Sequence, residues 1–484
     1  MRSKLANPVD SGEPLVFRRL GVFSQSVIVL RRLLHQAEID RAVLFAILAR
    51  TWGVAAGPVT ALFIATKFTP ALQGYYYTFM SLLGLQVFAE LGLGTVIIQF
   101  ASHEWSRLGL DDRGRIIGDK SSLSRLVTLA QAALKWYLAA GIIVILGLGL
   151  GGNIFFSQSP GAIINWRWPW YTLCFLTGIN LSLVPIWSLL EGCNQVSKVY
   201  FYRFFQGLCT TLSIWLAISL GAKLWIASFS SLAGFICAAT FIRRDFWNFF
   251  KILFFARPTG QRLHWRSEIL PMQWRIALSW ISGYFAFSLF TPILFQYQGP
   301  EVAGQMGMTW SLVVCVGAIS SAWLFPRVPQ FGMLIAQREY NKLDRIFWHT
   351  TKIMASTSSL LALAVWLLVS ILYTIHHPLA NRILPPLPMG IFLLAQVIQT
   401  ISFPISSYLR AHKKEPLLFL SVIFAGLNVL SALILGRYFS STGIAVGYLM
   451  ANLIIFPCLV WVWYRCRTKW HSLGSEDLIT KAIS

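Results

Sequence analysis

Three ionisable residues lie inside long apolar stretches of the chain, where charges are rare. Arg50 lies in the first stretch, Glu90 in the second and Lys135 in the third. At the centre of a membrane-spanning helix such a charge costs at least about 2.5 to 3.5 kcal/mol on insertion scales, so it needs a reason. The chemistry that these residue types offer is anion binding by the cations, ion pairing, and carriage of a proton or cation by the carboxylate.

Helix geometry places the three residues in one layer. At a rise of 1.5 Å per residue, each lies about 12 to 15 Å from the same end of its helix. A turn of about five residues joins the first two stretches, which predicts antiparallel neighbours and therefore an ion pair between Arg50 and Glu90. A nearby opposite charge would keep Glu90 ionised. Lys135 has an alternative, because its long stem can reach the membrane surface.

The composition indicates what kind of elements hold these charges. The chain has 484 residues, of which 56% are hydrophobic and 12% charged, and its mean hydropathy is +0.62. These values are typical of a protein with many membrane spans. The net charge of +22 does not indicate nucleic-acid binding, because the basic residues lie between apolar runs. The seven cysteines and the histidines lack metal-site spacing, so we predict no metal or other cofactor.

Twelve segments have about the 20 apolar residues that a helix needs to cross a membrane. We therefore predict an all-α polytopic membrane protein with twelve transmembrane helices, at residues 42–66, 72–100, 126–151, 169–190, 200–220, 224–242, 274–295, 302–325, 353–373, 389–409, 417–435 and 444–463. The predicted domains are a basic N-terminal arm (1–41), an N-lobe (42–242), an interfacial linker (243–273), a C-lobe (274–463) and a tail (464–484).

The loops at the two ends of these segments differ in charge. Of the 40 lysines and arginines, the loops on one side hold five, namely Lys67, Arg167, Lys223, Arg382 and Arg437, and nearly all the others lie on the opposite side. Cytoplasmic loops are enriched in basic residues, so this asymmetry predicts that both termini, the linker and the tail are cytoplasmic.

An internal repeat relates the two lobes. The segment PALQGYYYTFMSLL, which begins at Pro70, recurs as PEVAGQMGMTWSLV, which begins at Pro300, and Gly74 corresponds to Gly304. Because each lobe has six predicted spans, the repeats should run parallel, with a central cavity between them. The tyrosines of the first copy, at 75 to 77, are expected in an interfacial aromatic belt.

Three stretches resemble a known family. They are GYYYTFMSLLGLQVFAELGLGTVIIQF, the Glu191-Gly192 turn, and FPRVPQFGMLIAQREYNKLDRIF. They are similar to the lipid-linked oligosaccharide flippases (O-antigen and polysaccharide transport proteins) of the multidrug/oligosaccharidyl-lipid/polysaccharide exporter superfamily. The likeness covers about residues 42–465, although its motifs are short. It implies a transporter of the cell inner (plasma) membrane that flips an undecaprenyl-pyrophosphate-linked glycan to the outer leaflet. It also implies alternating access and coupling to an ion gradient of H⁺ or Na⁺.

The resemblance suggests roles for the candidate residues. The substrate's pyrophosphate would need cations, for which the candidates are Arg50, Lys135, Arg203 and Arg275, while Glu90 would couple ions or pair with Arg50. Arg203 and Arg275 can also be ordinary basic anchors near the membrane surface.

The predicted span at residues 389–409 offers candidate contacts for the glycan. Gln396 and Gln399 share one helical face with Ser402 and Ser406, which could contact sugar hydroxyls or bond to neighbouring helices.

Two other functions compete with a flippase. A multidrug/cation antiporter of the same superfamily would have a similar fold, but that branch uses acidic groups, whereas the first span offers Arg50 and no acid. A membrane enzyme acting on envelope glycans would need catalytic groups on a substantial outer loop, and the outer loops here are short. We therefore predict a transporter and not an enzyme.

Overall fold

The computed structural model describes residues 41–111, 115–158, 164–258, 260, 263–412 and 416–483. The predicted arm therefore lies almost wholly outside the described residues. Eight helices in the described part are long and apolar enough to cross a membrane, and ten if each of two bent helix pairs is one crossing. The protein is thus an all-α polytopic membrane protein, as predicted. The count of twelve spans stays a prediction.

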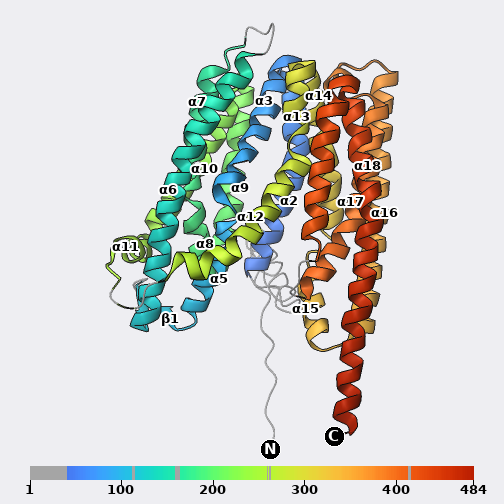
Figure 1. Cartoon of the computed structure of the whole chain (residues 1–484). Coiled ribbons are helices and arrows are strands. Elements are labelled where there is room, and N and C mark those ends of the chain that lie inside the picture. Colours follow the sequence, from blue (N-terminus) through green and yellow to red (C-terminus); the bar gives the residue numbers. More distant parts are fainter. Residues whose placement is uncertain are drawn as a thin grey trace, which may run out of the picture.

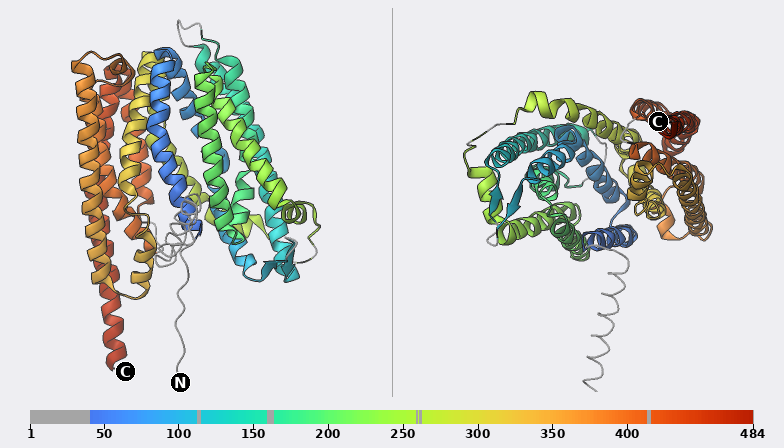
Figure 2. Two further views of the ribbon diagram at one scale, coloured as in Figure 1. Left: turned by 180° about the vertical axis from the view of Figure 1, so that it is seen from behind. Right: turned by 90° about the horizontal axis from the view of Figure 1, so that it is seen from below.

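The helices form two groups that lie side by side (Figure 1 and the right view of Figure 2). The N-terminal group comprises α2 (Arg41–Lys67), α3 (Pro70–Leu83), η1 (Gly84–Gln86), α4 (Val87–Glu90), α5 (Leu93–Trp105), α6 (Lys120–Ser157), α7 (Arg167–Leu181), α8 (Val184–Gly192), α9 (Val196–Ser219) and α10 (Trp225–Asp245). Two short strands, β1 (Leu108–Leu110) and β2 (Ile116–Gly118), pair antiparallel before α6, a feature that the sequence did not predict.

A connecting segment leads to the C-terminal group. It contains α11 (Trp247–Phe255) and the π-helix η2 (Trp265–Ile269), and α11 packs on α6. The C-terminal group comprises α12 (Leu270–Phe287), α13 (Phe290–Gln298), α14 (Pro300–Ser321), α15 (Val328–Ala336), α16 (Tyr340–Thr374), η3 (Pro378–Arg382), α17 (Pro386–Ala411) and α18 (Leu418–Ile483). The predicted domain boundaries fall near these transitions and stay predictions.

Two features make the helices differ from straight spans. Leu91 and Gly92 both have positive φ, which ends α4 and bends the chain by 45° into α5. Glycine adopts this conformation without cost, and a side chain at Gly92 would also overlap Ile276 of α12. In α18, Ser440 has non-helical angles, and the arm after it folds back so that Gly447 packs against Ser431.

The two copies of the internal repeat pack against each other in the structure, as α3 and α14. We call the end of the bundle where α3 and α14 begin the Pro70 end, and the opposite end, where α6 begins, the Lys120 end. Gly74 and Gly304, which correspond in the repeat, lie in contact where α3 crosses α14. A Cβ at Gly74 would overlap the carbonyl oxygen of Pro300, so only glycine permits this approach.

The hydrophobic core is shared by both groups toward the Pro70 end. Tyr75 of α3 contacts Phe156 of α6 and Phe295 of α13, with ring centroids 5.6 and 4.9 Å apart. Tyr75 is 1% exposed, so the expectation of an interfacial belt for it was wrong, because the helix crossing buries this side chain. At the Lys120 end the C-terminal group has a separate core that includes Phe331, Phe347 and Tyr408.

Candidate functional site

Arg50 lies where the two groups face each other near the Lys120 end. It is an exposed residue of α2, and its guanidinium carbon is 3.8 Å from the centroid of the Phe325 ring, which follows α14. Within the described residues, Arg50 takes part in no ion pair. A guanidinium over an aromatic face keeps its donors available for an anion.

The predicted ion pair between Arg50 and Glu90 is wrong for this structure. No ion pair in the described part of the chain includes Glu90. The physical reason is that α2 packs on α9 and α14, whereas α4, which ends at Glu90, packs on α6 and α12. A short turn joins α2 to α3, but tertiary packing gives each of them other main neighbours.

The remaining basic candidates are Arg203, Lys135 and Arg275. Arg203 is bound to Glu191 of α8, with Nη2 and Oε1 2.6 Å apart. Lys135 is exposed on α6, and the side chain of Arg275 lies outside the described residues. The structure therefore shows Arg203 in an ion pair within the N-terminal group, a contact that the sequence did not predict, and its role stays a prediction.

The polar face of α17 divides between two environments. Gln399, Ser402 and Ser406 line a cavity of about 110 Å³ between α17 and the two arms of α18, where Asn452 also lies. Gln396 instead donates to Thr400 and packs against Gly317 of α14. Three of the four residues thus face one cavity, as their spacing predicted, whereas Gln396 packs against a neighbouring helix.

A second polar cavity was not predicted. It is an open space of about 520 Å³ in the N-terminal group, and its polar lining residues are Gln86, Thr177, Asn180, Gln206, Thr210, Ser230 and Ser231. The signal that could have revealed it is the presence of these amide and hydroxyl side chains on η1, α7, α9 and α10, where an apolar core would exclude them. Its described lining carries no charged side chain.

Ionic clusters at the Lys120 end were also missed. Arg125 binds Glu104 of α5 and Glu268 of η2, at distances of 2.7 and 2.6 Å. The backbone N–H of His264 and the Arg125 guanidinium together lower the pKa of Glu268. In the C-terminal group, Tyr408 donates to Asp344, which also binds Arg467. The first cluster ties α5 and α6 to the connecting segment, and the second ties helices together within the C-terminal group. The two acids that Arg125 binds lie just outside the apolar stretches, which is the signal that could have revealed this cluster.

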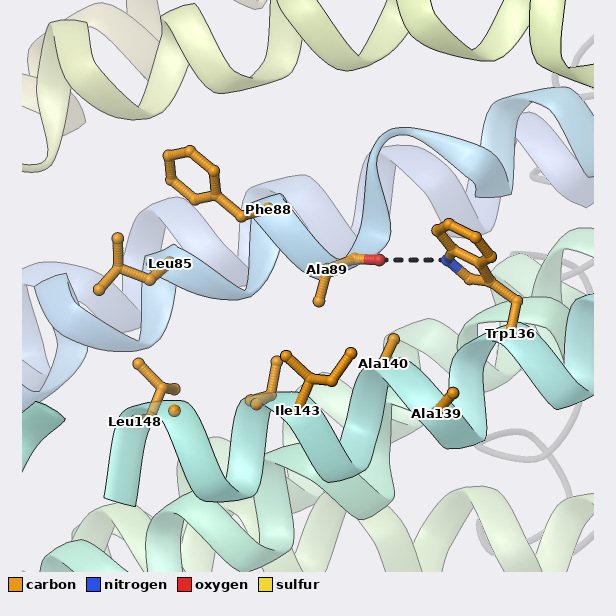
Figure 3. A pocket seen from close by; sticks show the side chains of 10 residues that line it. Leu85, Phe88, Ala89, Trp136, Ala139, Ala140, Ile143 and Leu148 are labelled. Atoms are coloured by element: carbon orange, nitrogen blue, oxygen red, sulfur yellow. Dashed lines mark hydrogen bonds between the residues drawn. The ribbon is translucent and has the colours of Figure 1, made fainter. Parts of the chain in front are cut away.

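An apolar groove runs along the N-terminal group between α4 and α6 (Figure 3). It encloses about 380 Å³ and is lined by Leu85, Phe88, Ala89, Trp136, Ala139, Ala140, Ile143, Val144, Gly147 and Leu148. The Trp136 indole N–H donates to the Ala89 carbonyl oxygen at 3.2 Å, which holds α4 against α6. In the described residues, no group of three or more His, Cys, Asp or Glu side chains could hold a metal ion.

No protein-family model and no curated protein matches the sequence. Solved structures do match over almost the whole chain. A multidrug resistance MATE family transporter of the MOP superfamily, in an inward-facing conformation, is 13% identical with a TM-score of 0.59, and the match covers 90% of this chain and 99% of that one. The lipid II flippase MurJ, in an inward closed conformation, is 14% identical with a TM-score of 0.59, covering 91% and 92%.

A MOP superfamily transporter from Pyrococcus furiosus is 12% identical with a TM-score of 0.52, covering 89% of this chain and 95% of that one. Identities this low show the fold alone. The chain therefore has the fold of MOP superfamily transporters and is a multi-pass membrane protein. The proteins it resembles are transporters or flippases rather than enzymes.

Proposed function

We propose that this protein flips a polyprenyl-pyrophosphate-linked oligosaccharide from the inner to the outer leaflet of the cell inner membrane. The observation that carries the proposal is Arg50, which stands between the two helix groups with no ion-pair partner in the described residues. An arginine fork suits a pyrophosphate, which it can bind through two parallel charge-assisted hydrogen bonds. A cation substrate would be repelled at the same position.

The orientation of the transporter follows from the basic loops. The Lys120 end is proposed to be cytoplasmic, because the loops at that end hold most of the lysines and arginines. Arg50 would then meet the head group as it enters from the cytoplasmic leaflet. The glycan would cross while the groups alternate their access by rocking, and Gln399, which lines the cavity between α17 and α18, is a candidate contact.

Glu90 is the proposed coupling residue. It lies at the break between α4 and α5, deep in a span and without an ion-pair partner among the described residues. Intramembrane carboxylates of this kind commonly carry a proton or a cation in transporters. Neutralising it with Glu90→Gln should leave exchange down a substrate gradient intact and remove the response to an imposed proton or sodium gradient.

The decisive experiment is reconstitution. The purified protein is placed in liposomes that contain a lipid-linked oligosaccharide with a fluorescent sugar, and arrival at the outer leaflet is measured by lectin capture. Arg50→Ala should slow transfer by about tenfold, because a hydrogen bond to a charged group contributes about 1.5 to 3 kcal/mol. Arg50→Lys should restore part of the rate, since lysine keeps the charge but lacks the fork.

A matched control separates anion binding from loss of a cation–π contact. Arg437 also lies over an aromatic ring, that of Tyr297, and Arg437→Ala should leave transfer unchanged. If the Arg50→Ala variant transfers the lipid at the normal rate, Arg50 does not bind the anionic head group.

The alternative function is a multidrug/cation antiporter. A MATE transporter and MurJ match this fold with the same TM-score. Uptake of ethidium without any lipid-linked transfer would establish that alternative and overturn the flippase.

A further inference from the structure

The apolar groove between α4 and α6 has the dimensions and lining of a hydrocarbon site. Its walls carry leucine, isoleucine, phenylalanine and alanine side chains, and it extends from Trp136 to Leu148 along α6. Thirteen residues of helix correspond to roughly 18 Å at 1.5 Å per residue. Ile143 on its rim is 66% exposed, so the groove is open along the side of the bundle.

Small residues create the groove. Ala89, Ala139 and Ala140 leave room between the helices, and a Cβ built at Gly147 would meet no atom within 4 Å. Packed protein interiors rarely leave such space empty. In a membrane, a trough of this kind is filled by a hydrocarbon chain, since water would gain no polar partner from its lining.

A cation stands at the end of the groove nearest the Lys120 end. Lys135, Ala139, Ile143 and Gly147 are spaced by four residues and therefore form one stripe of α6. Lys135 is exposed, whereas the next three positions of the stripe line the groove. The site thus pairs an apolar channel with a positive charge at one end, which complements a lipid that has an anionic head.

The groove also borders the contact between the two helix groups. Phe88 forms its upper wall in Figure 3 and contacts Tyr284 and Phe285 of α12, with ring centroids 5.8 and 5.5 Å apart. A chain lying in the groove would therefore touch a residue that packs directly on the C-terminal group.

We infer that this groove binds the isoprenoid tail of the transported lipid, with Lys135 facing the first phosphate, so that the tail stays in the membrane while the head crosses. The inference rests on the proposed function for the identity of the lipid. It assigns Lys135 to the tail site rather than to a central cavity. Ordinary phospholipid chains are the competing occupant, and the experiment distinguishes the two.

The test is photocrosslinking of the full chain in nanodiscs. A benzophenone amino acid replaces Ile143, and, as the control, Leu146, which is 58% exposed on the same helix but does not line the groove. Undecaprenyl phosphate is added, and the crosslinked lipid is identified by mass spectrometry. Crosslinking to this probe should be about tenfold higher at 143 than at 146.

Two pairs of variants sharpen the result. At Gly147, which lines the groove, an added Cβ meets no atom within 4 Å, so Gly147→Leu should fill the groove and lower the crosslink at 143 by about tenfold. Gly151→Leu, one turn further along α6 and with the same space for a Cβ, should not. Lys135→Ala should lower capture of undecaprenyl phosphate about threefold and leave capture of uncharged undecaprenol unchanged. Gly147→Leu should likewise slow lipid-linked transfer while leaving the amount of folded protein unchanged.

Equal crosslinking at both positions, or crosslinks to bulk phospholipid alone at 143, would overturn the inference. An unchanged crosslink in Gly147→Leu would do the same. Because binding is measured without transport, a protein that captures the probe at 143 yet moves no lipid-linked glycan would refute the proposed function and leave the tail groove standing.

Discussion

The two ends of the molecule hold the helix groups together in different ways. At the Pro70 end, α3 and α14 meet backbone to backbone at Gly74 and Gly304, and both groups share one hydrophobic core. Gln73 reinforces this end by donating to the carbonyl oxygens of Gly304 and Arg382. At the Lys120 end, the C-terminal group has its own core, and Arg50 reaches across to Phe325.

The difference shows where a change of access would be costly. Separating the groups at the Pro70 end means exposing a packed glycine crossing and buried aromatic rings. At the Lys120 end, one ionic cluster ties the N-terminal group to the connecting segment and the other lies within the C-terminal group. Rigid groups with a strong contact at one end and a weak one at the other can rock about that contact. The predictions below test this asymmetry, beginning with the largest effect.

The Arg125 cluster, which ties α5 and α6 to the connecting segment, should have the largest effect on stability. Arg125→Ala leaves Glu104, whose side chain is 7% exposed, without its arginine partner, and should lower the free energy of unfolding by about 3 kcal/mol. The measurement is thermal unfolding in detergent. Arg244→Ala is the control, because the Arg244 side chain is 85% exposed and its ion pair with Asp245 should contribute less than about 1 kcal/mol. Equal effects of the two variants would mean that the cluster does not hold the group.

The glycine crossing at the Pro70 end should come next. Gly74→Ala forces a methyl group into the Pro300 carbonyl oxygen and should cost about 1 to 3 kcal/mol. It should also increase labelling of a cysteine placed at the buried Ala303, next to Gly304 on α14, because the crossing must open. Gly53→Ala in α2 is the control, since a Cβ there meets no atom within 4 Å. If the Gly74→Ala variant has the melting temperature and the labelling rate of the parent, the glycine crossing does not hold the two groups together at the Pro70 end.

The contact at the Lys120 end should contribute less. Phe325→Leu removes the aromatic face under Arg50 and should lower the free energy of unfolding by about 0.5 to 1 kcal/mol, the range of an exposed cation–π contact. The melting temperature is compared with that of Gly74→Ala under the same conditions. If Phe325→Leu is as destabilising as Gly74→Ala, the contacts at the two ends are equally strong. The groups would then not rock about the Pro70 end.

The smallest effect should be the pH dependence of the connecting segment. Because its pKa is lowered in the folded state, Glu268 adds stability above its unfolded pKa of about 4.5, and that stability is lost as the pH falls through the folded pKa. In the Glu268→Gln variant the melting temperature should therefore fall less steeply on acidification. The difference corresponds to a change of less than about 1 kcal/mol in the free energy of unfolding. An identical decline in parent and variant would show that Glu268 does not contribute.

Much of the fold could be predicted from the sequence because it depends on local properties. Long apolar runs must lie in lipid, which predicted a polytopic helical protein, and the repeat of Pro70 and Gly74 at Pro300 and Gly304 predicted two related halves. The three- and four-residue spacing on α17 correctly placed Gln399, Ser402 and Ser406 on one face.

What the sequence by itself determined is therefore that the chain is a helical membrane protein with many apolar spans, and which residues of α17 share a helix face. The tertiary structure alone decided which helices are neighbours, and so placed Arg50 against Phe325 rather than Glu90 and buried Tyr75 in the shared core. The physical reason is that solvation and helical periodicity act within one segment. Helix pairing instead depends on close packing between residues hundreds of positions apart, such as Gly74 and Gly304, whose contact has no local signature.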